Sequence, residues 1–444
     1  MLNSDENLFD VSNFDFWVTS PSVYKEFKKY SPKKERIPSE EEKFNEFLKS
    51  KLLESNKENL KCVSESLFST CKSIFTSHLL TKVNQQYFLK LLANLSSEIS
   101  VTDFINSTEL HSWVKECSEN DDPKVFLEAW KILQNIESTD NAVKYIYGVY
   151  PLIPPWKNQE DPVADVVLVH GIKGGAAYTW RQHDSCKIRP VLQQSQRRKL
   201  LSKNFEETSY QESLLNERYS WIWPLDWLSH SVSKPVRLIA IDYSSDSWYN
   251  EEDENRNCSL EELSSKIHKK LKAAGVGSRP IIWITHSMGG LIVKAIMKNE
   301  SCRYNEELPC SSDIMSSTRA VIFFSVPHFG SPVASWACYL SPLVKPSRYI
   351  YDMKAGSSYL FHIHEVFSKL CEEKSIQVLT LNEAKPLPLT KNGPNVMFVP
   401  NKYGNPGIGQ FYEIDASHLD VCKPTGRTDE KYRIIEEFIM RLPF

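Results

Sequence analysis

The sequence lacks any long apolar run and any excess of charge of one sign. No stretch of the 444 residues approaches the ~18 consecutive apolar residues that a transmembrane helix needs. The 53 basic residues are balanced by 56 acidic residues, so the overall positive charge typical of nucleic-acid-binding proteins is missing. We therefore expect neither a membrane span nor a nucleic-acid partner in a chain long enough for two or three domains.

Paired cysteines and nucleotide-binding motifs are also missing. The ten cysteines are scattered without a CxxC pair, as expected of thiols that are kept reduced. Because no P-loop, Rossmann glycine pattern or cluster of metal ligands is present, we expect no cofactor and no metal. The acidic residues Asp5, Glu6 and Asp10 are not typical of a secretory signal or a mitochondrial presequence, so the N-terminus shows no recognisable targeting signal.

The first third of the chain changes from a polar to a helical pattern. Residues 1–38 are rich in Lys, Glu and Ser and are expected to be largely disordered. Residues 39–150 repeat the apolar period of amphipathic helices, and the last of these is expected to begin at Pro123 behind Asp122. This repetition predicts an armadillo-like helical segment, with an ordinary helical subdomain as the alternative.

A group of prolines between residues 151 and 162 ends the helical part and begins a second domain over residues 151–444. This domain contains six short apolar runs separated by helical stretches: ADVVLV, VRLIAI, IIWITH, AVIFFSV, IQVLTLNE and NVMFVP. Runs that are apolar throughout are typical of parallel strands covered on both faces. We predict an α/β fold with a doubly wound, mostly parallel sheet, and catalytic groups at the carboxyl ends of its strands.

A strand, a tight turn and a helix follow one another around Ser287. The turn has the sequence Thr285-His286-Ser287-Met288-Gly289-Gly290 and is typical of a nucleophile elbow, in which a strained turn lifts a serine above the sheet. Thr285 stands where glycine is usual in that motif. The alternative is that Ser287 only caps the helix through its hydroxyl.

The partners of a serine nucleophile are expected later in the chain, in the order acid and then histidine. His418 lies in a loop near the C-terminus, where the base is expected, and His328, directly after a strand, is the second candidate. Glu383 ends an apolar strand and is the first candidate for the acid. Asp415 is the reserve acid, because it and Asp420 lie so close to His418 that they are expected to shape its loop.

Backbone N–H groups that stabilise a negatively charged oxygen are expected in two places. One belongs to Met288, directly after the serine, and the other to Ile172, in the loop after ADVVLV. His170 and Gly171 end that strand, and Gly174 follows, which suits a loop whose backbone approaches a substrate closely.

Five segments carry a resemblance to a known family: DVVLVHGIKGGAAYTWRQ, WPLDWL, THSMGGLIVK, FFSVPHFGSPVA and SHLDVCKP. Over nearly all of residues 143–444, the chain resembles the serine-active-site-containing, lipase-like proteins implicated in phosphatidylglycerol remodelling. The resemblance implies an α/β-hydrolase with Ser287, Glu383 and His418 as its catalytic triad, behind an armadillo-like helical segment. It also implies peripheral association with mitochondria and endoplasmic-reticulum contact sites. Longer members of the family carry a membrane-anchoring N-terminus, and no such segment is recognised in this sequence.

A basic segment followed by tryptophans is the candidate for contact with lipid. It runs from Arg181 to Lys203 and precedes WIWPLDWL, which contains Trp221, Trp223 and Trp227. Tryptophans and charges in such a segment are more often core residues and a solvated face, which is the favoured interpretation. The alternative is that the segment touches anionic headgroups of a membrane or acts as a lid.

The sequence therefore predicts a serine hydrolase or acyltransferase that acts on ester bonds through an acyl-enzyme. The resemblance directs this prediction to the acyl chains of phospholipids. The alternative from another class is a catalytically idle α/β-hydrolase scaffold whose helical segment recruits a protein partner. A third interpretation, within the enzyme class, is a soluble esterase or protein-acyl thioesterase.

Overall fold

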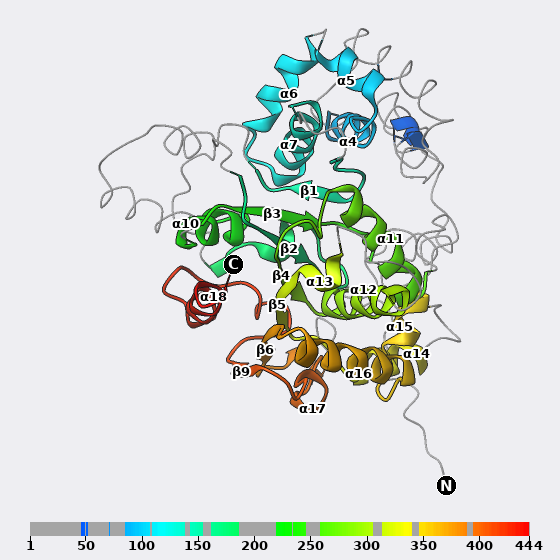
Figure 1. The fold of residues 1–444 in the computed structure, drawn as a ribbon, viewed down its shortest axis with the longest axis vertical. Helices are drawn as coiled ribbons and strands as arrows, with labels where there is room; N and C mark the ends of the chain where they lie inside the picture. Colours follow the sequence, from blue (N-terminus) through cyan, green and yellow to red (C-terminus); the bar gives the residue numbers. More distant parts are fainter. Residues whose placement is uncertain are drawn as a thin grey trace, which may run out of the picture.

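The computed structural model describes residues 46–48, 50, 51, 71, 85–106, 109–137, 143–153, 161–185, 219–232, 234–245, 258–304, 313–339, 346–388 and 394–443. The disorder predicted for residues 1–38 lies outside these. In the described part, a central sheet carries helices on both faces, and a helical segment lies at one end of it (Figure 1).

Seven strands form the main sheet. Their spatial order is β1 (Val149–Pro151), β3 (Val236–Ile241), β2 (Ala164–Val169), β4 (Ile281–His286), β5 (Thr318–Phe324), β6 (Gln377–Glu383) and β9 (Gln410–Ile414). Every neighbouring pair is parallel except β1 with β3. The predicted α/β-hydrolase fold is thereby confirmed. Because the strand order reverses at β2, the crevice for a ligand is expected at the carboxyl ends of β2 and β4.

Both faces of the sheet are covered, which explains why its strands are apolar throughout. One face packs on α11 (Leu260–Ala273), α12 (Met288–Tyr304), α13 (Ile314–Ser317), α15 (Arg348–Asp352) and α16 (Ser358–Glu373). The other face packs on η4 (Pro224–Leu228), which continues into α10 (Ser229–Ser231), and on α18 (Glu430–Met440). Successive strand residues alternate between the two cores, with Trp283 in one and Ile284 in the other. Shorter helices are η2 (Tyr178–Trp180), α14 (Pro332–Tyr339) and α17 (Asn401–Gly404).

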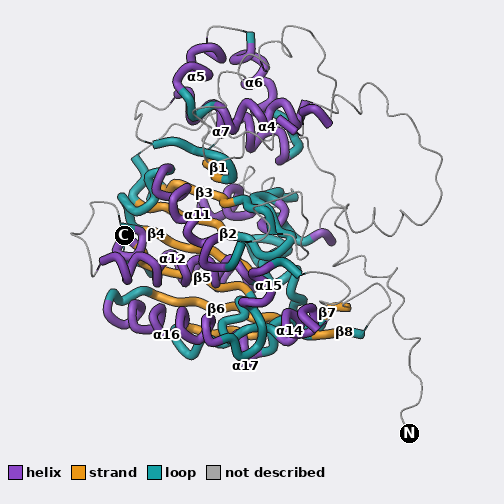
Figure 2. Tube along the Cα trace, turned by 90° about the vertical axis from the view of Figure 1, so that its right-hand side faces the viewer, coloured by secondary structure: helices purple, strands orange, loops and turns teal. Residues whose placement is uncertain are grey.

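The helical segment consists of α4 (Gln85–Leu95), α5 (Ile99–Asn106), α6 (Leu110–Ser118) and α7 (Pro123–Glu137). These helices gather beyond β1, at one end of the sheet (Figure 2). Helix α7 begins at Pro123 as predicted, and the Asp122 carboxylate accepts the Lys124 N–H (2.9 Å). One face of α7 packs on the other helices, and its Trp130 joins the core of the sheet. The armadillo-like character of this segment stays a prediction, as does the domain boundary at residue 151.

Near the C-terminus the strand assignments differ from the sequence prediction. The run NVMFVP does not join the main sheet; only Asn395–Val396 (β8) is a strand, and it pairs antiparallel with β7 (Leu387–Pro388). The prediction of a parallel strand there was wrong, because Phe398 and Val399 pack against a small separate cluster with Val333. The edge strand β9 takes the last position instead.

Candidate active site

Ser287 occupies the sharp turn between β4 and α12. Its φ of 52° lies in the left-handed region, which non-glycine residues seldom adopt. The Ser287 N–H donates to the Phe324 carbonyl oxygen (2.9 Å), and the Gly290 N–H donates back to the Ser287 carbonyl oxygen (3.1 Å). These bonds hold a strained residue at the carboxyl end of the central strands, as a nucleophile elbow requires.

Small residues let the start of α12 pack directly on β2. A Cβ atom on Gly289 would lie 2.3 Å from the Val169 carbonyl oxygen, so only glycine fits there. Thr285 departs from the usual glycine of the motif, and its buried hydroxyl donates to the Ile322 carbonyl oxygen on β5 (3.0 Å). The larger residue is accommodated because its polar atom is hydrogen-bonded across the sheet.

The structure brings Ser287, His418 and Glu383 together. His418 Nε2 lies 3.2 Å from Ser287 Oγ, and the His418 Nδ1–H donates to Glu383 Oε2 (2.5 Å). With the proton on Nδ1, the lone pair of Nε2 faces the serine hydroxyl, which is the arrangement that general-base activation of a serine needs. Ser287 and His418 retain 9% and 8% of their surface exposed.

Glu383 is ionised by its surroundings although it is buried. Burial alone would raise the pKa of this carboxyl, but His418 and hydrogen bonds from the Val399 and Phe398 backbone hold the pKa below its usual value. Asp415, the reserve acid, is exposed and pairs with Lys385 (2.8 Å). The carboxylate that contacts His418 is thus that of Glu383.

The His418 ring is also held by neighbours that the sequence pattern did not indicate. Phe398 stacks on it, with ring centroids 5.1 Å apart and planes at 15°. The His286 Nε2–H donates to the His418 carbonyl oxygen (2.9 Å). Burial and the nearby His418 ring keep the pKa of His286 well below its usual value, so His286 acts here as a neutral donor. No short-range sequence signal relates Phe398 to His418, since they come from different loops.

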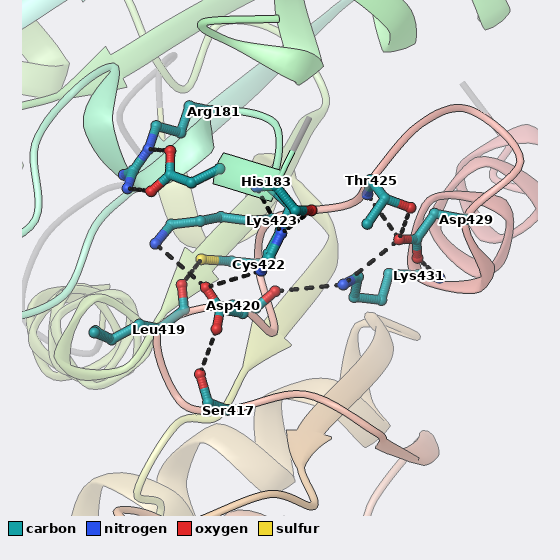
Figure 3. A network of polar contacts seen from close by, with 12 residues as sticks. Arg181, His183, Ser417, Leu419, Asp420, Cys422, Lys423, Thr425, Asp429 and Lys431 are labelled. Carbon is teal, nitrogen blue, oxygen red and sulfur yellow. Dashed lines mark hydrogen bonds and ion pairs between the residues drawn. The ribbon is translucent and has the colours of Figure 1, made fainter. Parts of the chain in front are cut away.

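The loop that carries His418 is stabilised by polar contacts around Asp420 (Figure 3). The Ser417 hydroxyl donates to Asp420 Oδ2 (2.6 Å), while Asp420 Oδ1 lies 3.6 Å from His183 Nε2 and 3.9 Å from Lys423 Nζ. Asp420 therefore shapes the loop rather than contacting the ring of His418.

The second candidate base, His328, lies in a different cluster. Its Nδ1 faces the amino group of Lys294 (2.7 Å), which also faces His364 Nδ1 (2.8 Å). Burial and the adjacent amine keep the pKa of His328 well below its usual value. His328 is fully buried, so the structure gives His418 alone of these two the contact with Ser287.

The expected oxyanion donors lie beside the serine. Met288 opens α12, where N–H groups have no acceptor within the helix. Ile172 follows Gly171, where an added Cβ atom would lie only 2.7 Å from Ser287 Cβ. Within the part of the chain that the structure describes, neither N–H donates to another protein group. Both are thus available to an oxygen atom of a substrate.

The tryptophans of the candidate lipid-contacting segment prove to be core residues. Trp223 and Trp227 are buried and pack against α18, as the core interpretation expects, so the alternative of lipid contact does not hold for these two. Arg181 is buried as well, and its guanidinium donates to the Asp184 carboxylate (2.6 and 3.0 Å). Residues 186–203 of that stretch lie outside the described residues.

Neither a metal site nor a membrane span emerges from the described residues. No group of three or more His, Cys, Asp or Glu side chains there is placed to hold a metal ion. Among the helices that the structure describes, none is long and apolar enough to cross a membrane.

Comparison with known proteins gives the relatives of this chain. No protein-family model matches it. Human Protein SERAC1 is 30% identical over 368 residues, which cover 80% of this chain and 50% of the human protein. This chain is thus similar in sequence to the SERAC1 proteins. Zebrafish Protein SERAC1 is 28% identical over 362 residues, with the same shares covered. The chain spans about half the length of the SERAC1 proteins it matches.

Among solved structures, the mature form of the Bacillus licheniformis lipase BlEst2 is similar with a TM-score of 0.34 and 13% sequence identity. The likeness covers 62% of this chain and 92% of the lipase. The match to the SERAC1 proteins agrees with the resemblance that the sequence motifs carry.

Proposed function

We propose that this chain is a serine hydrolase or acyltransferase that acts on ester bonds of lipids through an acyl-enzyme. The observation that carries the proposal is the line of contacts from Ser287 Oγ to His418 Nε2 and from His418 Nδ1 to Glu383 Oε2, set on an α/β-hydrolase sheet. These residue types in this order supply a nucleophile, a base and an acid.

In the proposed first half-reaction, His418 takes the proton of the Ser287 hydroxyl while Oγ forms a bond to the ester carbonyl carbon. The carbonyl oxygen becomes negatively charged and accepts hydrogen bonds from the N–H groups of Met288 and Ile172. The imidazolium of His418 is stabilised by Glu383 and then gives its proton to the leaving alcohol, as the bond between that alcohol and the acyl carbon breaks.

The second half-reaction releases the acyl group from Ser287. His418 accepts a proton from the attacking hydroxyl as its oxygen bonds to the acyl carbon, and it then gives this proton to Ser287 Oγ as the bond between Oγ and the acyl carbon breaks. If water attacks, a fatty acid leaves and the reaction is hydrolysis; if a lysophospholipid hydroxyl attacks, the acyl group is transferred. Both outcomes use the same residues, so the accessibility of the acceptor decides between them.

The resemblance to the serine-active-site-containing proteins supports a phospholipid substrate, with phosphatidylglycerol as the first to test. It also supports peripheral location at mitochondria and endoplasmic-reticulum contact sites, where an anionic membrane surface is available. We assign the hydrolase to residues 151–444 and the recruitment of a protein partner to the armadillo-like segment within residues 39–150.

The test uses the purified chain with a p-nitrophenyl ester and with phosphatidylglycerol vesicles, with and without added lysophosphatidylglycerol. Turnover that is lost in Ser287→Ala and His418→Ala, but kept in the exposed control Ser278→Ala, supports the proposal. The ratio of free fatty acid to transferred acyl chain distinguishes hydrolysis from transfer. Absence of turnover with every ester, in folded protein, would favour the idle scaffold.

A further inference from the structure

The carbonyl oxygen of Gly171 accepts three hydrogen bonds. The His170 Nδ1–H donates to it over 2.7 Å, the Gly174 N–H over 3.0 Å and the Ser245 hydroxyl over 3.4 Å. A carbonyl oxygen has two lone pairs, so these donors use its capacity fully. The direction of this C=O bond is therefore determined by its neighbours, and His170 makes the shortest contact.

The ring of His170 is itself held in one orientation. It is fully buried and stacks on Tyr243, with centroids 4.2 Å apart and planes at 6°. The Tyr243 backbone N–H donates to Nε2 (3.3 Å), and Asp242 Oδ1 lies 3.2 Å from the same nitrogen, on the side of the ring away from Gly171. The Tyr243 hydroxyl donates to the His170 carbonyl oxygen. Because a ring nitrogen 2.7 Å from a carbonyl oxygen needs a proton between them, the geometry assigns a proton to Nδ1.

The peptide bond after Gly171 transmits this orientation to Ile172. No cis peptide bond occurs in the part of the chain that the structure describes, so this peptide is trans. In a trans peptide the C=O and the following N–H point in opposite directions. Holding the Gly171 oxygen on one side therefore directs the Ile172 N–H to the other side.

We propose that His170 is a positioning residue, which holds the Gly171 carbonyl oxygen so that the Ile172 N–H faces the oxygen that becomes negatively charged on the ester. This inference rests on the proposed function and names a residue outside the triad. The Ile172 N–H has no acceptor among the described residues. Gly171 lies against the nucleophile, since an added Cβ atom would be 2.7 Å from Ser287 Cβ.

The contact from His170 has a second effect on the same peptide. Hydrogen bonds in a chain polarise one another, so donation to the Gly171 oxygen makes the Ile172 N–H a stronger donor. The stronger donor matters most when the substrate oxygen carries a negative charge, which is in the transition state. Loss of the His170 contact should therefore lower kcat and leave KM nearly unchanged.

The first arm of the test compares His170→Leu with His170→Asn on a p-nitrophenyl ester. Leucine removes the donor, and kcat should fall by roughly 10²-fold with KM within about twofold, at the lower end of the loss seen when an oxyanion donor is deleted. The side-chain amide of the asparagine variant would place an N–H near the position of Nδ1, so His170→Asn should keep kcat within about tenfold of the unsubstituted chain. Thermal unfolding of both variants checks that each is folded.

The second arm measures protonation in the unsubstituted chain. The ring ¹⁵N signals of His170 in the full chain, assigned by their loss in folded His170→Asn, report whether Nδ1 carries a proton. A protonated Nδ1 supports the inference. An unprotonated Nδ1, or a folded His170→Leu variant with kcat within threefold of the unsubstituted chain, overturns it.

The two proposals fail in different ways. If the unsubstituted chain neither turns over an ester nor labels with a fluorophosphonate at Ser287, the proposed function fails, and a role for His170 in catalysis fails with it. If the unsubstituted chain is active and His170→Leu is equally active, only the positioning role is lost.

Discussion

Two clusters of side chains along α12 differ in the group that faces their histidines. The serine cluster (Ser287, His418 and Glu383) lies at the start of α12, and the lysine cluster (Lys294, His328 and His364) lies around a residue two turns further along that helix. Both are buried except for His364, which is partly buried, and in both an imidazole nitrogen lies within hydrogen-bond distance of an ionisable side chain. The difference lies in that partner.

In the serine cluster a carboxylate accepts a hydrogen bond from the Nδ1–H, so that the lone pair of Nε2 points toward the serine. In the lysine cluster the group that faces Nδ1 of both rings is the amine of Lys294 and not a carboxylate. Burial keeps the pKa of Lys294 well below its usual value, and burial and Lys294 lower the pKa of His364 to about 3. Burial thus disfavours a charge on each member of the lysine cluster, whereas the serine cluster pairs its histidine with a carboxylate.

The largest expected effect comes from removing the carboxylate that distinguishes the serine cluster. Glu383→Gln should lower kcat by about 10⁴-fold, the loss that follows when a triad acid is neutralised, with little change in thermal unfolding. Asp415→Asn is the matched control, because Asp415 is exposed and pairs only with Lys385 among the described contacts. The measurement is kcat of both variants with the same ester. Equal kcat in Glu383→Gln and the control would show that the carboxylate of Glu383 does not take part in catalysis.

Removing a histidine from the lysine cluster should affect stability and not chemistry. His328→Leu leaves the Lys294 amine with one acceptor fewer in the core, which costs about 1–3 kcal/mol of unfolding free energy. The kcat of the folded variant should stay within about threefold, since His328 makes no contact with Ser287. Urea unfolding and kinetics measured on the same preparation test both parts. A kcat loss as large as that of His418→Ala would show that the choice between the two histidines is mistaken.

Acid should destabilise the fold through the neutral histidines. The pKa values of His286, His328 and His364 are lowered in the folded state, so the unfolded chain binds more protons once the pH falls below about 6.5, the usual histidine value. Stability should therefore decrease from about pH 6.5 downward, by up to about 1.4 kcal/mol per pH unit for each histidine. The lowered pKa of Glu383 adds a loss in the same direction below its usual value near 4.5.

Urea unfolding at several pH values measures this dependence. His364→Leu removes one of the three histidines, so its stability should depend less steeply on pH than that of the unsubstituted chain. A dependence that is flat between pH 6.5 and pH 5, or one unchanged in the variant, would contradict the assignment of neutral rings to the lysine cluster.

The smallest expected effect concerns the other hydroxyl of the turn. Thr285→Val keeps the shape of the side chain but removes the hydrogen bond to the Ile322 carbonyl oxygen, which should cost about 0.5–1.5 kcal/mol. Because this hydroxyl faces β5 and not the substrate, kcat should change by less than about twofold. A large loss of kcat with unchanged stability would assign Thr285 to the chemistry.

The local signals in the sequence located the serine cluster well. A β-branched run, a turn of small residues and an amphipathic helix lie next to one another in the chain, so the position of Ser287 follows from nearest neighbours. Glu383 follows similarly, because it is the last residue of an apolar strand, and the carboxyl ends of parallel strands share one edge of the sheet. The pairing of Glu383 with His418 needs only this edge and the order of the chain.

Local sequence signals could not predict contacts between segments that are distant in the chain. The run NVMFVP is as apolar as a strand, yet Phe398 packs on His418, a partner set by the tertiary fold. Trp223 and Trp227 stand near basic residues in sequence but face the core. Lys294 has the sequence surroundings of an ordinary helix lysine, and its burial becomes apparent only when two remote histidines are brought to its amine.

Active-site labelling tests the central claim, that Ser287 is a nucleophile activated by His418, most directly. The full chain is treated with a fluorophosphonate probe, digested and mapped by mass spectrometry, with Ser287→Ala and His328→Leu treated in parallel. We expect one modified residue, Ser287, with labelling lost in Ser287→Ala and retained in folded His328→Leu. A folded chain that takes no label, or a label that persists in Ser287→Ala, would contradict it.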